Sequence, residues 1–201
     1  VDKIINKISG EYFKNYFINK IKRNTNGAQI YYGKENEFIN YDKVVIATHA
    51  NQALELIEKK TDEEVRILEN FKYCENIAVI HSDYSFMPKT KRAWCSWNSS
   101  MNSKYPEKNS VTYWLNQLQN LKISKDIFLT INPFNEISKN KIYKTIKFTH
   151  PYYDESALAH QNQLHLIQNK KNILFCGSYF GYGFHEDGIK SSIEMLKSIN
   201  D

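Results

Sequence analysis

The sequence predicts an α/β protein with an antiparallel or mixed sheet inserted into it, on three observations. Two short apolar runs, "KVVIATHA" (43–50) and "KNILFCGS" (171–178), end in small residues and lead into helical patterns. Such runs are typical of strands that are buried on both faces of a parallel sheet. Residues 72–148 instead consist of short strand-like segments separated by polar turns. Finally, residues 154–168 and 188–199 have the periodicity of amphipathic helices.

The first sixty residues predict a hairpin, a buried strand and a helix. "KNYFINKIKR" (14–23) and "QIYYG" (29–33) are strand-like, and "TNGA" between them carries Asn26-Gly27, a strong hairpin signal. The run at 43–50 is the buried strand, and a helix is expected to follow it over about 50–60.

A second helix is predicted to begin after Thr61, because a threonine followed by acidic residues is an N-cap signature. Val65, Leu68 and Phe71 would form its buried face. In the helix at 154–168 the corresponding buried residues would be Leu158, Leu164 and Ile167.

Five strands are expected between these helices, in "NIAVIHSD", "RAWCSWNSS", "SVTYWLNQL", "IFLTINP" and "KIYKTIKFTH". The predicted organisation is therefore one α/β domain made of 1–68 and 166–201, with a sheet domain over 69–165.

Composition narrows the class of protein. With 41% hydrophobic residues in 201, the chain can bury a core, and no apolar stretch is long enough to span a bilayer. The net charge is +5, but only three of the 27 basic residues are arginines and the lysines are scattered, which does not favour a nucleic-acid partner. Three cysteines without a CxxC pair indicate reduced thiols and a cytoplasmic protein, and no metal site is predicted.

The segment "FCGSYFGYGFHEDGIKSS" (175–192) holds four of the seven glycines at a strand-to-helix junction. Glycines let a ligand approach the main chain, and the N–H groups of a first helical turn attract anions. Gly177-Ser178 and Asp187-Gly188-Ile189 are the two turns that would bind a phosphate or a polarised carbonyl oxygen. The alternative is that these glycines serve only the turns themselves.

This segment resembles the C-terminal flavin-contact segment of the flavin-containing amine oxidase superfamily, and "YDKVVIATHANQAL" is similar to that superfamily's return strand. With "MPKTKRAWCSWN", "TYWLNQLQ" and "INP", the resemblance is closest to bacterial FAD/NAD(P)-binding oxidoreductases associated with cyclopropane-fatty-acid synthases. It implies an FAD/NAD(P)-binding two-domain flavoprotein fold, with an incomplete dinucleotide-binding domain and an inserted substrate-binding sheet domain.

One departure from the family is large. The family begins with a GxGxxG turn that binds the FAD pyrophosphate, and this sequence has none, so the resemblance covers the C-terminal half only. The missing N-terminal segment is therefore an expected partner.

The resemblance also implies an FAD site. Ile18 would lie beside the adenine, and Ala47, Thr48 and His49 would line the cofactor cleft. Gly177 and Ser178 would approach the pyrophosphate and ribityl chain. Backbone N–H groups of Asp187, Gly188 and Ile189 would face the flavin N1–C2=O edge, where reduced flavin carries negative charge.

Several side chains keep two interpretations. His185 is either an acid/base group at the flavin edge or a loop residue. His49 is a cofactor contact or a turn residue, and His81 is a cavity residue or a satisfied sheet histidine. Trp94, Trp97 and Tyr113 would wall an apolar substrate pocket, or belong to the core.

The function implied is FAD-dependent oxidation or desaturation of a small or lipid-like apolar substrate. One alternative is an amine or amino-acid oxidase, for which Arg92 is the available carboxylate clamp. The other is a non-catalytic fragment that binds a partner chain.

Overall fold

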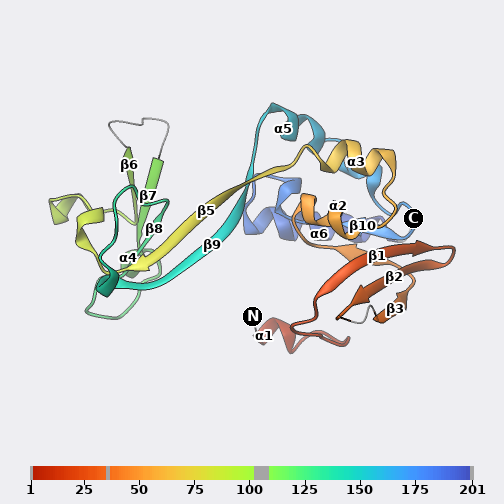
Figure 1. The fold of residues 1–201 in the computed structure, drawn as a ribbon, viewed down its shortest axis with the longest axis horizontal. Helices are drawn as coiled ribbons and strands as arrows, with labels where there is room; N and C mark the ends of the chain where they lie inside the picture. Colours follow the sequence, from red (N-terminus) through yellow and green to blue (C-terminus); the bar gives the residue numbers. More distant parts are fainter. Residues whose placement is uncertain (1, 35–36, 102–108, 200–201) are drawn as a thin grey trace. The chain divides into compact units, whose positions relative to one another are not determined.

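The computed structural model describes residues 2–34, 37–101 and 109–199. The chain divides into two compact units, one made of 1–72 and 151–201 and the other of 73–150 (Figure 1). The first contains a three-stranded sheet, a pair of parallel strands and most of the helices, and the second is built on an antiparallel sheet. The predicted α/β class is thus confirmed at the level of its elements.

The elements of the first unit are α1 (Asp2–Ile5), β1 (Ile18–Asn24), β2 (Gly27–Tyr32), β3 (Glu37–Tyr41), β4 (Val44–Ile46), α2 (Ala50–Leu56), α3 (Asp62–Leu68), α5 (Glu155–Gln161), the 3₁₀ turn η4 (Leu164–Ile167), β10 (Ile173–Phe175), η5 (Ser178–Phe180) and α6 (His185–Lys197). β1 and β2 form the predicted hairpin, but Thr25 and Asn26 occupy its turn. Gly27 opens β2, where a Cβ would lie 2.1 Å from the Tyr41 carbonyl oxygen. Close approach of β3, rather than turn geometry, therefore requires this glycine.

The predicted cap of the second helix is confirmed. The Glu64 N–H donates to Thr61 Oγ1 (3.2 Å), and the Thr61 N–H donates to Glu64 Oε2 (2.8 Å). Glu64 is also fully buried and pairs with Arg23 of β1. This ion pair joins α3 to the three-stranded sheet.

The second unit contains β5 (Lys72–His81), η1 (Tyr84–Phe86), η2 (Lys91–Ala93), β6 (Trp97–Met101), β7 (Asn109–Trp114), α4 (Leu115–Leu118), β8 (Phe128–Ile131), η3 (Lys139–Lys141) and β9 (Ile142–Tyr152). The strand order is β6-β7-β8-β5-β9, and the β6–β7, β7–β8 and β8–β5 pairs are antiparallel. β5 and β9 connect this sheet to the first unit (Figure 1). Each of the five predicted strand segments contains a strand, although "RAWCSWNSS" begins as a 3₁₀ turn.

The predicted boundaries of the sheet domain differ from this division after residue 150. α5 and η4 belong to the first unit, where both pack against α3. Leu164 and Ile167 are buried as predicted. The prediction for Leu158 is wrong, because its side chain is 43% exposed: the helix stops at Gln161 and turns a different face inward.

Candidate functional site

The strongest candidate site lies where two parallel strands end. β4 and β10 pair in parallel, with Ile46 opposite Phe175, and the Cys176 N–H donates to the Ile46 carbonyl oxygen (3.2 Å). Carboxyl ends of parallel strands meet at one edge of a sheet, where α/β proteins bind their ligands. The structure therefore brings together the predicted residues that follow the two strands, which are Ala47, Thr48, His49, Gly177 and Ser178.

Gly177 has a backbone that other residues rarely adopt, with φ 156° and ψ 169°. A Cβ there would lie 2.8 Å from Cε1 of the buried Tyr179 and 3.6 Å from the Thr48 carbonyl oxygen. Its N–H donates to Ser191 Oγ (2.9 Å), and the Ser191 hydroxyl donates to the Gly188 carbonyl oxygen (2.7 Å). Ser191 therefore ties the end of β10 to the first turns of α6.

Asp187 shapes the loop before α6. Its Oδ2 accepts hydrogen bonds from the N–H groups of Tyr182 and Phe184, both at 3.0 Å. A Cβ on Gly181 would lie 2.5 Å from the carboxyl carbon of Asp187, so a glycine is needed there. The carboxylate is thus turned into its own loop.

The predicted amide donors need correction. The N–H groups of Asp187 and Gly188 donate to the Phe184 carbonyl oxygen, at 3.1 and 3.3 Å. These amides close the first turn of the helix instead of facing outward. The first N–H groups of a helix have no acceptor within the helix. At this terminus they are those of His185 and Glu186, which precede Asp187.

Open space adjoins Gly188. A Cβ on this residue would meet only the Ser178 nitrogen within 4 Å, at 3.8 Å, when the helix's own backbone is set aside. Ile189, the next residue, is 57% exposed, and the side chain of His185 is exposed at the first position of the helix. A side chain at position 188 would therefore reach ordinary van der Waals contact with the main chain of Ser178 and meet no closer neighbour there.

Two other predicted contacts lie at the ends of elements. His49 is the N-cap of α2, and its N–H donates to Gln52 Oε1 (3.2 Å). Ile18 is half-buried at the start of β1, in a different sheet from the strand ends of the site. Both remain predictions as cofactor contacts.

The three aromatic residues predicted to wall a substrate pocket do not form one wall. Trp97 and Tyr113 are paired across β6 and β7, with ring centroids 5.0 Å apart, and Trp97 is 62% exposed. Trp94 precedes β6 and packs on Trp114 and Phe128. Its Nε1–H donates to the Pro88 carbonyl oxygen (2.8 Å). Side chains alternate along β7, so Trp114 and Tyr113 point to opposite faces, and Trp94 packs on the face away from Trp97 and Tyr113.

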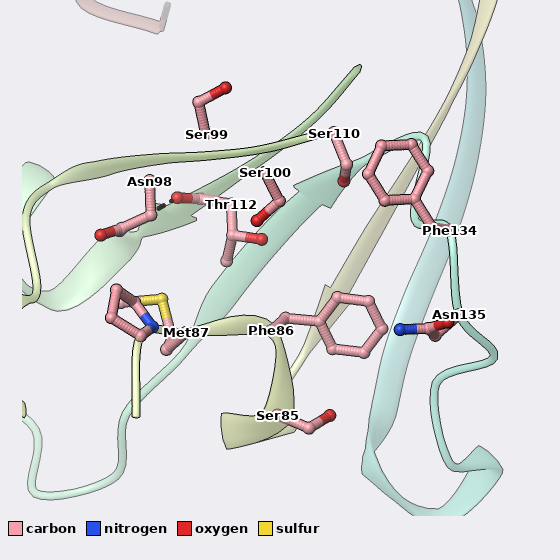
Figure 2. A pocket seen from close by; sticks show the side chains of 11 residues that line it. Ser85, Phe86, Met87, Asn98, Ser99, Ser100, Ser110, Thr112, Phe134 and Asn135 are labelled. Carbon is pink, nitrogen blue, oxygen red and sulfur yellow. Dashed lines mark hydrogen bonds between the residues drawn. The ribbon is translucent and has the colours of Figure 1, made fainter. Parts of the chain in front are cut away.

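The sheet unit has a cavity of about 190 Å³ on the face of β6 and β7 that carries Asn98 and Thr112 (Figure 2). Trp97 and Tyr113 alternate with these residues and so lie on the opposite face. Sequence reasoning missed this cavity. The available signal was a threonine within each of two strand segments whose neighbouring residues are apolar, Thr112 in "SVTYW" and Thr130 in "IFLTI".

His81 is a satisfied sheet histidine. It is fully buried, its Nε2 lies 2.7 Å from Thr130 Oγ1, and its Nδ1 accepts from the Asp83 N–H (3.0 Å). Burial lowers the pKa of His81 to about 4, against the opposing charge of Asp83. Burial raises the pKa of Asp83, but hydrogen bonds from Lys141 and Ser85 outweigh it, so that this pKa is lowered overall.

No protein-family model matches the sequence, and no curated protein sequence matches it. Solved structures do share its fold. A fatty acid isomerase from P. acnes that produces CLA has a TM-score of 0.64 at 12% identity over 98% of this chain and 50% of its own. Putrescine oxidase bound to putrescine has a TM-score of 0.64 at 9% identity, over 100% of this chain and 52% of its own. A candidate protoporphyrinogen oxidase from Exiguobacterium sp. 255-15 has a TM-score of 0.56 at 13% identity, over 92% and 46%.

The chain thus spans about half the length of the structures whose fold it shares. None of the helices in its described residues is long and apolar enough to cross a membrane. Within the same residues, no group of three or more His, Cys, Asp or Glu side chains is placed to bind a metal ion.

Proposed function

We propose that this chain is the C-terminal half of an amine oxidase-like, FAD-dependent oxidoreductase that oxidises or desaturates a small or lipid-like apolar substrate. The observation that carries the proposal is the junction of the β4 and β10 ends, where Gly177 and the open space beside Gly188 leave main chain accessible. The fold shared with a fatty acid isomerase and with putrescine oxidase supports it. The sequence motifs add the bacterial subfamily associated with cyclopropane-fatty-acid synthases.

The residues present fit the cofactor at this junction. Gly177 and Ser178 would approach the pyrophosphate and ribityl chain, beside Ala47, Thr48 and His49. The N-terminus of α6, with its outward amides at His185 and Glu186, would stabilise negative charge at the flavin N1–C2=O edge. When bound, FAD supplies two-electron oxidation by accepting a hydride while a base accepts the accompanying proton. His185 is the proposed acid/base group.

The proposed partner is the other half of the same fold, in a cytoplasmic protein. β4 is paired only with β10 among the described strands, and Val45 at its centre is 42% exposed. On α6, Ile189, Ile193 and Leu196 are between 53% and 57% exposed at positions that share one helix face. A neighbouring strand and helix would cover this apolar surface, as in larger parallel sheets.

FAD binding tests the proposal directly. FAD is titrated into the complete polypeptide that contains this chain, and flavin fluorescence and the visible spectrum are followed. We expect saturable binding, and we expect Gly188→Val to weaken it at least tenfold, because its side chain would occupy the open space beside Ser178. Gly10→Val is the control, since a Cβ on Gly10 meets nothing within 4 Å and Gly10 lies far from the site in sequence.

Absence of FAD binding by the complete polypeptide would contradict the proposal and favour the non-catalytic, partner-binding fragment. The likeness to putrescine oxidase favours a second candidate, an amine or amino-acid oxidase. Arg92, its candidate clamp, is exposed in η2. Anaerobic bleaching of the flavin by putrescine, but not by a fatty acid, would select the amine oxidase.

A further inference from the structure

The cavity in the sheet unit is lined by polar groups on one side and by rings on the other. Figure 2 shows the hydroxyls of Ser100, Ser110 and Thr112, from β6 and β7, directed into it. The rings of Phe86 and Phe134 face them from the loops after β5 and β8. None of the eleven described residues that line the cavity is charged.

A hydrogen-bonded chain of buried side chains ends at this cavity. The Asp83 N–H can only donate, so the Nδ1 of His81 is an acceptor and carries no proton. The lowered pKa of His81 keeps the ring neutral at pH 7, and its proton is therefore on Nε2, which donates to Thr130 Oγ1. Thr130 Oγ1 in turn lies 2.8 Å from Thr112 Oγ1.

The direction of the last hydrogen bond follows from the partners available. In the described part of the chain, Thr130 Oγ1 has two partners, His81 and Thr112. Because His81 donates, the fully buried Thr130 hydroxyl can place its own hydrogen only on Thr112. The Thr112 hydroxyl accepts this bond, and its own hydrogen is then directed to the cavity.

Two other polar side chains at the cavity are engaged by the protein. Both hydrogens of the Asn98 amide are used, on the carbonyl oxygens of Cys95 (2.6 Å) and Thr112 (3.3 Å). The Ser110 hydroxyl donates to the Ile131 carbonyl oxygen (2.9 Å), so its oxygen remains an acceptor toward the cavity. The wall thus offers a fixed donor at Thr112 and an acceptor at Ser110, two residues apart along β7 and so on the same face.

We propose that this cavity is a binding site for a neutral, hydroxyl-bearing small molecule, whose oxygen accepts from Thr112, whose hydroxyl donates to Ser110, and whose carbon face packs against Phe86 and Phe134. Charged ligands are disfavoured, because no lining charge would compensate for their desolvation. A cavity of about 150 Å³ holds one benzene molecule, so about 190 Å³ suits a polyol up to the size of one sugar ring. This site does not depend on the flavin proposal.

The test is a binding titration on the full chain, with the intrinsic fluorescence of its three tryptophans as one readout and calorimetry as the other. The probes are glycerol and myo-inositol as neutral polyols, glycerol 3-phosphate as the charged analogue and benzene as the apolar one. We expect one of the neutral polyols to bind with one-to-one stoichiometry and at least tenfold more tightly than the charged and apolar probes. Equal or tighter binding of glycerol 3-phosphate or benzene, or no polyol binding up to 50 mM (a limit of about 2 kcal/mol in affinity), would overturn the proposal.

Two variants separate the site from the fold. Thr112→Val keeps the side-chain shape and removes the donor, and it should weaken polyol binding about tenfold. Thr145→Val, the same change at an exposed position of β9, is the matched control and should leave binding unchanged.

Ser100→Leu covers the case in which Thr112→Val does not fold. Ser100 is exposed, so this change is compatible with folding, and its larger side chain should fill the cavity and abolish polyol binding. A folded Ser100→Leu variant that binds the polyol as the unmodified chain does would refute the placement of the site.

Discussion

Acid should weaken the sheet unit through one buried histidine. Burial lowers the pKa of His81 to about 4 in the folded chain, from an ordinary value of 6.5. The folded state therefore binds fewer protons than the unfolded state between these pH values, and stability rises with pH across this window. The gap of about 2.5 pH units corresponds to a contribution of about 3 kcal/mol, present above pH 6.5 and lost as the pH falls to 4.

Replacement by glutamine isolates this contribution. In His81→Gln the amide can still accept from the Asp83 N–H and donate to Thr130, but it does not titrate. Asp83 and Lys141, the charged groups nearest the ring, are present in both proteins, so their own titration largely cancels in the comparison.

The assay is urea unfolding at several pH values between 7 and 4, followed by tryptophan fluorescence. All three tryptophans lie within residues 73–150, so the signal reports on the sheet unit. The advantage of the unmodified protein over His81→Gln should shrink by about 3 kcal/mol from pH 7 to pH 4. A difference that stays constant over this range would show that the ring is not held neutral by burial, and would remove the basis for the proton positions in the threonine chain.

Three substitutions in the first unit have expected outcomes. Thermal unfolding followed by circular dichroism measures the changes in stability, and an FAD titration measures the change in cofactor binding. Glu64→Gln leaves the buried Arg23 charge without its partner and should cost about 3–5 kcal/mol, and an unchanged melting temperature would contradict the burial of this pair. Gly177→Ala forces a side chain into a glycine-only backbone against Tyr179 and should cost at least about 1–3 kcal/mol, whereas a neutral effect would mean that this turn is not formed. Gly188→Ala, in a helix with open space beside it, should raise stability by up to about 1 kcal/mol while weakening FAD binding, and unchanged binding would count against the cofactor placement.

Local patterns predicted the elements whose signals are themselves local. The cap at Thr61 depends on residues three positions apart, and the parallel strands at 44–46 and 173–175 were visible as short apolar runs. The hairpin was also visible, although Gly27 serves close packing against Tyr41 and not the turn. Pairings between distant segments were beyond such patterns, so Leu158 was expected inside and the boundary of the sheet domain was expected at residue 165.

The sequence by itself determined where glycines, capping residues and buried strands occur, because these depend on backbone conformation within a few residues. Only the tertiary structure decided which of these groups are free to bind. The amides of Asp187 and Gly188 close the helix, and Trp94 lies apart from Trp97. Thr112 of β7 is hydrogen-bonded to Thr130 of β8 and lies in the polar wall of a cavity. A hydrogen-bonding group can bind a ligand only when no nearer protein partner has taken it, and that depends on segments far apart in the chain.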